Sequence, residues 1–325
     1  MFKKYFLNFM QLTRMYSLAT VLASCIIVLS FAHFHEKFSI INFILLTLAL
    51  CCLNLFENLY DDFVDIKAQV DKGVKLQDVK FNSFVPKAKL ILDGTFSFKQ
   101  VAVILSVLAL IPSLIGIYFI FFAGFPVLIF MALGVVLTLF YPFSSRFYLA
   151  EIVVALIYGP LMILGGYYAL TGEFNFNLLW VSLAIFFSTT QLLHAHSLMD
   201  WEFDVIENRK TLCILSKSKD NSILVLKLMI SLAYAIIVLG VLTHNLNPYS
   251  LFVFLTLPIA TKLFESMKDY INVKQTEYPR RWYYGMFENW KFIAENKIDF
   301  FMYRFYLSRN FSLFFALFLA IGTVI

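Results

Sequence analysis

Long apolar runs separated by shorter polar segments make up most of the chain. A helix needs about 20 apolar residues to cross a bilayer, and the runs reach about this length. They predict nine membrane-spanning helices, at residues 15–33, 39–57, 101–121, 123–142, 150–171, 177–198, 222–243, 248–264 and 302–325. The pattern therefore predicts an all-α polytopic membrane protein, folded as a single domain over residues 1–325.

The last predicted span carries two charges. Arg304 and Arg309 fall in its first turns. Long basic side chains near a helix end can reach the membrane surface with their charged groups. We therefore expect both arginines to snorkel toward the surface.

The composition agrees with a membrane protein. The chain is 61% hydrophobic and 14% charged, with a mean hydropathy of +0.79, whereas soluble domains are about half apolar and about a quarter charged. Four cysteines show no disulfide or zinc spacing and are interpreted as small apolar residues: Cys25, Cys51, Cys52 and Cys213. The first run has the length of a true crossing, so we expect no cleavable signal peptide.

Basic residues lie almost entirely on one side of the predicted bundle. When those near span ends are counted with the adjacent loop, all of the 26 Lys and Arg except Lys37 fall on the side of the N-terminus. The positive-inside rule places this side in the cytoplasm. We expect a multi-pass protein of the plasma membrane or cell inner membrane. The net charge of +5 then reflects topology and not nucleic-acid binding.

Polar and acidic side chains follow the second predicted span in the segment NLYDDFVD, residues 58–65. If the helix continues, Asn58, Asp62 and Asp65 lie at i, i+4 and i+7 and share one face. Carboxylates at the edge of hydrocarbon cost free energy unless a cation accompanies them. One such cluster alone is better explained as a solvated helix end.

A second cluster follows the sixth predicted span, in HSLMDWEFD at residues 196–204. His196, Asp200 and Asp204 lie at i, i+4 and i+8, again on one face. The two clusters can form one site if their helices are neighbours. Oxygen ligands of this kind suit Mg²⁺, which binds one or two carboxylates together with water and phosphate oxygens. We expect Mg²⁺ carrying a diphosphate; a transition-metal site is disfavoured because no Cys or third His accompanies His194 and His196.

Cationic side chains accompany both clusters. Lys89 follows the first, Arg209 and Lys210 follow the second, and Arg146 lies in the fourth loop. Arg and Lys bind phosphate oxygens that a metal leaves unclaimed. Each alone is better explained as a topology determinant, but their regular placement beside the acids makes phosphate binding a competing interpretation.

The two acidic segments resemble motifs of the UbiA superfamily of intramembrane prenyltransferases, particularly its 1,4-dihydroxy-2-naphthoate branch. NLYDDFVDIKAQVD (58–71) is similar to the first motif of that branch. LLHAHSLMDWEFDVIENRKTL (192–212) is similar to the second. The matching residues are Asn58, Asp62, Asp65, Asp71, Asp200, Glu202, Asp204, Lys210, Thr211 and Leu212.

Further segments extend the resemblance to roughly residues 10–260. LAEIVVALIYGPLMILGGYYALTGE (149–173) resembles the fifth span of the branch, and KLILDGTFSFKQ (89–100) resembles its turn before the third span. The chain departs from the branch at His196 and Ser197, where two Asn are usual, and at Met199, where an Arg is usual. These departures bear on the acceptor.

The resemblance implies an intramembrane cavity that opens to the cytoplasm and holds two Mg²⁺ ions with a polyprenyl diphosphate donor. Asn58, Asp62 and Asp65 would hold one ion, and Asp200 and Asp204 the other. The residues implied in substrate binding also include Lys89, Arg146, Arg209, Lys210 and Tyr141. The implied reaction transfers the polyprenyl group to a small aromatic acceptor, with 1,4-dihydroxy-2-naphthoate of menaquinone biosynthesis favoured.

His196 has two interpretations. Its imidazole can orient or deprotonate a hydroxyl of the acceptor, which an Asn amide cannot do. Alternatively, it replaces the Asn as a hydrogen-bonding side chain.

Other functions remain open from the sequence. An enzyme of the same superfamily with another acceptor, or a terpene cyclase, would use the same donor site. A cation-coupled transporter belongs to a different class, but its ion sites usually lie near the membrane midplane at broken helices. The eighth loop, 265–301, predicts an amphipathic surface element or a lid, and is equally explained as a charged connection. The donor chain length and the oligomeric state are left open.

Overall fold

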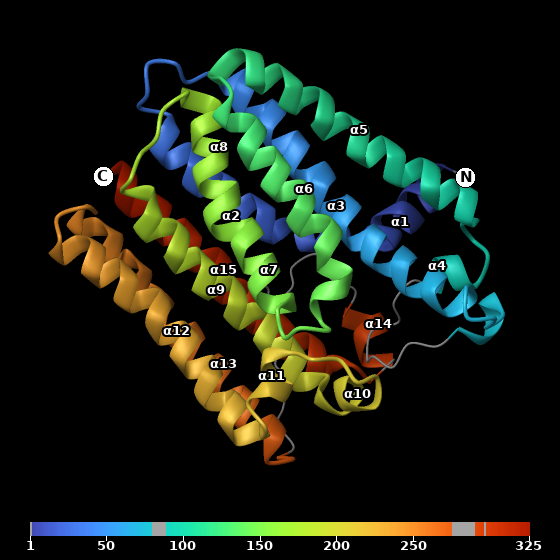
Figure 1. Cartoon of the computed structure of the whole chain (residues 1–325). Coiled ribbons are helices and arrows are strands. Elements are labelled where there is room, and N and C mark those ends of the chain that lie inside the picture. Colours follow the sequence, from blue (N-terminus) through green and yellow to red (C-terminus); the bar gives the residue numbers. More distant parts are fainter. Residues whose placement is uncertain (1, 80–88, 275–289, 296) are drawn as a thin grey trace.

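The computed structural model describes residues 2–79, 89–274, 290–295 and 297–325. Every regular element within these residues is helical (Figure 1). Nine helical stretches of this part are long and apolar enough to cross a membrane, which confirms the predicted all-α polytopic architecture. The spans are η1–α2 (Met15–Ala32), α3 (Ile40–Val70), α5 (Phe98–Ala123), α6 (Pro126–Ser144), α7–η3–α8 (Ala150–Thr171), α9 (Leu178–Met199), α12 (Lys219–Leu242), η4–α13 (Pro248–Ile271) and α15 (Asp299–Val324).

Several spans are built from consecutive helical pieces, and short elements lie before the first span and between later ones. The pieces are η1 (Met15–Ser17), α2 (Leu18–Ala32), α7 (Ala150–Leu156), η3 (Ile157–Leu161), α8 (Met162–Thr171), η4 (Pro248–Thr256) and α13 (Leu257–Ile271). The short elements are α1 (Phe2–Leu12), η2 (Leu76–Asp78), α4 (Lys89–Leu92), α10 (Trp201–Ile206), α11 (Leu212–Leu215) and α14 (Trp290–Glu295). Because the spans alternate in direction, the short elements all belong to the side of the N-terminus.

The eighth loop, for which an amphipathic element or a lid is predicted, is described only in part. Residues 275–289 and 296 lie outside the described residues. In the described part, α13 continues to Ile271, beyond the predicted end of the eighth span at 264, and α14 follows from Trp290.

Helix ends follow local sequence chemistry. At the start of α5, the amide of Gln100 donates to Ser97 Oγ at 3.3 Å and the amide of Ser97 donates to Gln100 Oε1 at 2.9 Å, which forms a capping box. Pro126 occupies the first turn of α6, where its missing N–H costs nothing. Gly172, with φ of 73°, ends α8 in a conformation that strains other residues.

The fifth span contains a π-helical turn, η3, around Pro160. Proline lacks the amide that would continue the α-helical ladder, and such π turns often lie at functional sites. The turn also brings Gly159 against α9, where an added Cβ would lie 2.7 Å from the carbonyl oxygen of Ser182. The glycine therefore permits the close approach of η3 to the helix that carries His196.

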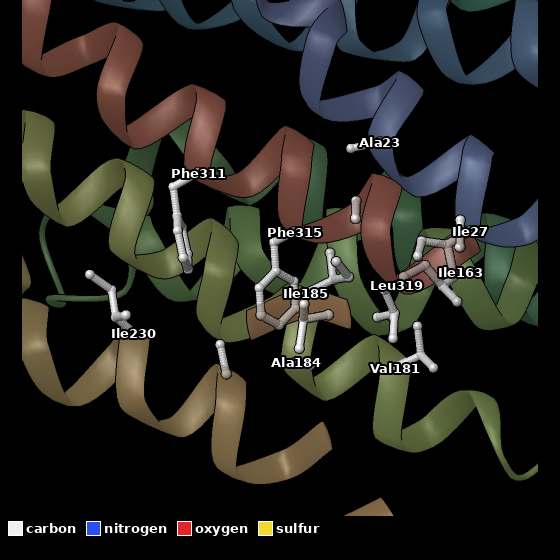
Figure 2. Packing of buried hydrophobic residues seen from close by; sticks show 14 of the residues in the cluster. Ala23, Ile27, Ile163, Val181, Ala184, Ile185, Ile230, Phe311, Phe315 and Leu319 are labelled. Atoms are coloured by element: carbon white, nitrogen blue, oxygen red, sulfur yellow. The ribbon is translucent and has the colours of Figure 1, made fainter. Parts of the chain in front are cut away.

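The helices α9 and α15 lie in the middle of the bundle, with α12 and α13 on one side and α2, α7 and α8 on the other (Figure 1). In the most apolar part of each span, 67% of the residues of α9 are buried but only 17% of those of α6, so α6 lies on the outside of the bundle. Figure 2 shows Val181 and Ile185 of α9 beside Phe315 and Leu319 of α15, within the largest apolar cluster. Packing of this kind holds helices together in a solvent that is itself apolar.

The expectation that Arg304 snorkels to the surface is wrong. Its side chain is fully buried at 0% exposure. Arg304 Nε donates to the carbonyl oxygen of Ser266 at 2.9 Å and Nη1 donates to that of Phe300 at 2.7 Å. The guanidinium also lies 5.1 Å from the centroid of the Tyr270 ring. The two carbonyl oxygens and the Tyr270 ring take the place of water around the charged guanidinium. Arg304 thereby joins α13 to α15.

Candidate active site

A cavity of about 300 Å³ opens where α3 and α9 leave the apolar part of the bundle. Side chains from α2, α3, α6, α7, η3, α9, α10 and α15 line it. Its volume lies at the lower end of the range typical of small-molecule sites. Most of the ionisable residues that the sequence singled out lie on its wall or beside it.

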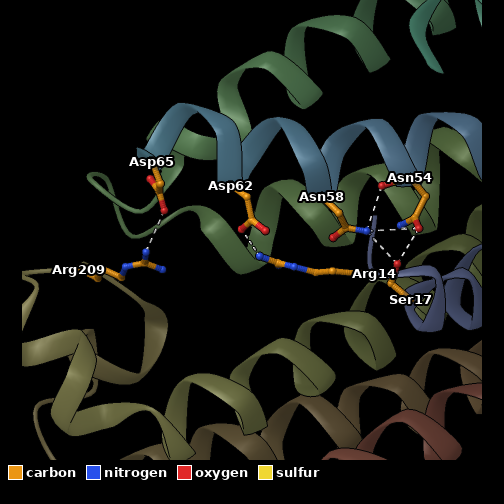
Figure 3. A network of polar contacts seen from close by, with 7 residues as sticks. All are labelled: Arg14, Ser17, Asn54, Asn58, Asp62, Asp65 and Arg209. Carbon is orange, nitrogen blue, oxygen red and sulfur yellow. Dashed lines mark hydrogen bonds and ion pairs between the residues drawn. The ribbon is translucent and has the colours of Figure 1, made fainter. Parts of the chain in front are cut away.

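The helix α3 supplies one wall. It continues beyond its apolar part to Val70, as the spacing of its polar residues predicts. Figure 3 shows Asn58, Asp62 and Asp65 projecting from the same side of α3, together with Asn54 one turn earlier. Asn58 and Asp65 line the cavity, and Asp62 is buried at 2% exposure.

Two arginines, Arg14 and Arg209, pair with the carboxylates of this wall. Arg14, in a left-handed conformation with φ of 52° between α1 and η1, forms an ion pair with Asp62 (Figure 3). Arg209 follows α10 in the sequence and contacts α3 at Asp65. The distance between its Nη2 atom and Asp65 Oδ2 is 3.1 Å, and that between its Nε atom and Glu207 Oε2 is 2.9 Å. Burial opposes the charge on Arg209, but Asp65 and Glu207 together raise its pKa above the ordinary value. Both arginines are therefore charged and held next to the cavity.

A chain of hydrogen bonds connects this wall to the membrane interior. Asn58 Nδ2 donates to Ser17 Oγ at 2.8 Å, and Ser17 Oγ donates to Asn54 Oδ1 at 2.7 Å. Asn54 Nδ2 donates to Tyr158 Oη, which in turn donates to Glu57 Oε2 at 3.3 Å. The chain ties α3 to η1 and η3, so it fixes the orientation of Asn58.

The second acidic cluster lies at a break between α9 and α10. The spacing of His196, Asp200 and Asp204 assumed a continuous helix, but α9 ends at Met199 and α10 begins at Trp201. The amide of Asp204 nevertheless donates to the carbonyl of Asp200 at 2.9 Å, and all three side chains line the cavity. Burial raises the pKa of the Asp204 carboxyl to about 7, with Arg209 acting against this rise and Asp200 adding to it.

His196 lies one turn deeper in the membrane than Asp200. Its ring stacks on Phe305 of α15, with centroids 4.6 Å apart and planes 19° apart. Tyr16 meets Phe305 edge-on at 6.1 Å. Among the described residues, the Nε2 atom of His196 is buried and has no hydrogen-bond partner. A polar atom buried in this way is available to a ligand in the cavity.

The remaining predicted residues are placed differently. Tyr141 lines the cavity. The other three cations, all of which the structure describes, are not among the residues that line the cavity. Lys89 is exposed at the start of α4, Arg146 lies 5.4 Å from the Phe143 ring centroid, and Lys210 lies 5.8 Å from that of Tyr148.

Several lining residues were not singled out from the sequence as site residues. They are Arg14, Asn54, Glu57, Glu151, Tyr158 and Arg309. Glu57 and Glu151 are almost fully buried, at 5% and 2% exposure. An ionisable residue inside an apolar span is a signal that would have drawn attention to Glu57. Arg14 gives no such signal, because it precedes the first span and looks like any topology determinant.

The donor set fits Mg²⁺ bound together with an anion. Among the described residues, no three His, Cys, Asp or Glu side chains are close enough to form a metal site of protein ligands alone. The two clusters instead face one cavity from different helices, each offering carboxylate oxygens. Mg²⁺ typically takes one or two carboxylates and completes its octahedron with water and phosphate oxygens. The arrangement therefore suits an anion held between two carboxylate-bound cations and flanked by Arg14 and Arg209.

The UbiA prenyltransferase family matches residues 18–287 of the chain. Among curated proteins, a 2-carboxy-1,4-naphthoquinone phytyltransferase of Synechocystis sp. is 30% identical over 122 residues. The match covers 38% of this chain and 39% of that protein, so it spans well under half of the relative.

Two solved structures share the whole fold. An apo UbiA homologue from Aeropyrum pernix K1 superposes with a TM-score of 0.60 at 16% identity, covering 95% of this chain and 97% of that one. A structure described as digeranylgeranylglyceryl phosphate synthase in membranes superposes with a TM-score of 0.60 at 13% identity, covering 99% of both chains. At these identities the likeness is one of fold.

Proposed function

The chain belongs to the UbiA prenyltransferase family, and we propose that it transfers a polyprenyl group from a polyprenyl diphosphate to a small aromatic acid, with 1,4-dihydroxy-2-naphthoate as the favoured acceptor. One observation carries the proposal. Two carboxylate clusters from distant parts of the sequence face one cavity, next to two arginines and at the edge of an apolar bundle. Such a site matches a donor with a multiply charged anionic head and a hydrocarbon tail.

Two Mg²⁺ ions are part of the proposal. Asn58, Asp62 and Asp65 hold one ion, and Asp200 and Asp204 hold the other. When bound, the ions neutralise the diphosphate and stabilise the charge that it gains as it leaves. Because Asp62 pairs with Arg14 and Asp65 with Arg209, these arginines are close enough to transfer their contacts to the diphosphate when the carboxylates bind metal.

The reaction follows from the charges of the site. The allylic C–O bond of the donor breaks, and its electron pair leaves with the diphosphate. A ring carbon of the acceptor forms a new C–C bond to the allylic carbon. For 1,4-dihydroxy-2-naphthoate this carbon loses its carboxyl group as CO₂, and the released electron pair restores the aromatic ring. The buried position excludes water, which would otherwise capture the allylic cation.

His196 and Tyr141 line the cavity beside the acidic clusters and contact the substrates in this proposal. The buried Nε2 of His196 accepts a hydrogen bond from an acceptor hydroxyl and so increases the electron density of the ring. The name of the Synechocystis relative, which includes a carboxylated naphthoquinone, supports a bicyclic aromatic acid.

The protein is a multi-pass membrane protein. The excess of Lys and Arg on the side of the N-terminus supports a cytoplasmic N-terminus and active site in a plasma membrane or cell inner membrane. The favoured acceptor would place the enzyme in menaquinone biosynthesis.

Two alternative reactions of a polyprenyl diphosphate would use the same donor site. A different acceptor, or cyclisation of the donor itself, needs only a change in the part of the cavity around His196. A cation-coupled transporter fits less well, because Asp62 and Asp65 lie beyond the apolar part of α3, and Asp200 and Asp204 lie where α9 ends and α10 follows, not at the midplane.

The proposal is tested with purified protein, Mg²⁺, a labelled polyprenyl diphosphate and a panel of aromatic acids. We expect a prenylated product with 1,4-dihydroxy-2-naphthoate. A product with another aromatic acid alone would correct the acceptor. Release of a cyclic hydrocarbon without any acceptor would identify a cyclase, and cation flux in liposomes without transfer would identify a transporter.

A further inference from the structure

The segment that follows α10 carries Arg209 to the first acidic wall. Residues 207–211, all of which the structure describes, form neither helix nor strand. Asn208 turns the chain in a left-handed conformation with φ of 53°, which Asn adopts more readily than most residues. Arg209 then pairs with Asp65 of α3 (Figure 3). Without regular structure of its own, the segment depends on contacts with other elements for its position.

Two amides of this segment are held by distant parts of the chain. The amide of Lys210 donates to the carbonyl oxygen of Ser145 at 2.8 Å. The amide of Leu212 donates to the side-chain oxygen Oε1 of Glu151 at 3.1 Å. The first bond joins two backbone groups, which most sequences could supply. The second needs an acceptor on the side chain at position 151.

We infer that Glu151 is a positioning residue of the donor site, whose Oε1 atom holds the segment in the place from which Arg209 reaches the acidic wall. The inference rests on the proposed prenyl transfer and concerns the diphosphate end of that site. It assigns Glu151 no contact with the reacting atoms.

The Glu151 carboxylate is itself fixed from a second helix. Glu151 lies in the first turn of α7 at 2% exposure, and α7 packs against α9. Ser197 Oγ of α9 donates to the same Oε1 atom at 3.1 Å. A buried carboxylate loses water and needs hydrogen-bond donors in its place. Oε1 therefore receives one bond from a continuous helix, which aims it, and one from the segment, which it restrains.

The two oxygens of Glu151 distinguish positioning from direct catalysis. Oε2 is buried and has no hydrogen-bond partner within the described part of the chain. A metal or a substrate would have to use this atom, because Oε1 already accepts two bonds. Glu151→Gln keeps an accepting oxygen for Ser197 and Leu212 and removes the negative charge. A positioning role therefore survives this substitution, and a direct contact with a cation does not.

The test measures binding of inorganic pyrophosphate in the presence of Mg²⁺, by calorimetry on the purified protein, which needs no turnover. We expect Glu151→Ala to weaken binding about tenfold, as Arg209→Ala does, and Glu151→Gln to remain within about threefold of wild type. The double variant Glu151→Ala/Arg209→Ala should bind no more weakly than Arg209→Ala, because one residue acts through the other. Additive losses, or a loss in Glu151→Gln as large as that in Glu151→Ala, would overturn the inference.

Leu212→Pro breaks the same hydrogen bond from the other side and leaves Glu151 intact. Proline has no amide hydrogen, and it suits the first position of a helix, which Leu212 occupies in α11. Thr211 before it is already extended, with ψ of 164°, as the residue before a proline prefers. Pyrophosphate binding should weaken about tenfold here too. Unchanged binding would contradict the inference even if Glu151→Ala failed to fold.

Gln191→Ala is the matched control for the loss of a buried polar side chain. Gln191 Nε2 donates to the carbonyl oxygen of Ser308 and to Ser312 Oγ, both at 3.1 Å, and Gln191 is not among the residues that line the cavity. The substitution should lower the thermal stability without changing the affinity for pyrophosphate. An equal loss of affinity in this control would mean that general destabilisation explains the effect of Glu151→Ala.

Kinetics add a second readout. Glu151→Ala should raise the donor KM about tenfold and leave the acceptor KM unchanged, because the segment carries no residue of the acceptor end. A wild type that binds pyrophosphate but prenylates no aromatic acid would refute the proposed transfer and leave this inference standing. A wild type that does not bind pyrophosphate with Mg²⁺ would overturn both.

Discussion

Arg209 and Asp65 are joined by an ion pair, with 3.1 Å between Nη2 and Oδ2, although 144 positions separate them in the sequence. The pair connects the first acidic cluster to the loop that follows the second. It therefore brings the two halves of the proposed diphosphate site together before any ligand binds. An arginine held by a carboxylate at the edge of the cavity is preorganised for an incoming anion.

Replacement of Arg209 by Ala should raise the donor KM about tenfold or more, because a charge-assisted contact to phosphate is lost. The acceptor KM should not change. Lys89→Ala and Arg146→Ala should also raise the donor KM, but less, because neither side chain lines the cavity. Steady-state kinetics with both substrates varied measure these effects. A raised acceptor KM with an unchanged donor KM would show that these cations serve the acceptor.

Asp62→Asn and Asp200→Asn should each abolish transfer without unfolding the protein. Each substitution removes a carboxylate from one metal site, and an amide is a weaker ligand for a hard cation. Turnover and thermal stability in detergent are measured together, with Asp220→Asn, an exposed residue of the first turn of α12, as the matched control. Full activity in either variant would remove that residue from the metal site.

Gly159→Ala should lower the free energy of unfolding by about 1–3 kcal/mol through overpacking. The added Cβ would lie 2.7 Å from the Ser182 carbonyl and 2.9 Å from the Phe186 amide nitrogen, both backbone atoms of α9. Gly134→Ala is the control, because its Cβ would meet only a Leu161 methyl group at 3.4 Å. Thermal unfolding in detergent compares the two, and equal stability would mean that α9 adjusts without cost.

The apolar runs predicted the spans well because a bilayer requires about 20 apolar residues for each crossing. The shared face of Asn58, Asp62 and Asp65 was also predictable, since it depends only on helical periodicity. The approach of Arg14 to Asp62 was not, because it depends on a left-handed turn between α1 and η1. The carbonyl partners of Arg304 likewise depend on how α13 packs against α15.

His196→Asn should change the pH dependence of kcat/KM if the imidazole accepts a proton from the acceptor. The wild-type profile should show an ionisation on its acidic limb, because a protonated imidazole cannot accept that proton. We expect the variant to lose this ionisation while its affinity for the donor stays the same. Superimposable profiles would leave His196 with a role in packing on Phe305.

The most direct test of the account is product formation by the purified wild-type protein with a labelled polyprenyl diphosphate and 1,4-dihydroxy-2-naphthoate, with and without Mg²⁺. We predict one equivalent each of prenylated ring, diphosphate and CO₂ with Mg²⁺, and no product after chelation. Transfer that persists undiminished when all divalent cations are removed would contradict the role assigned to the two acidic clusters.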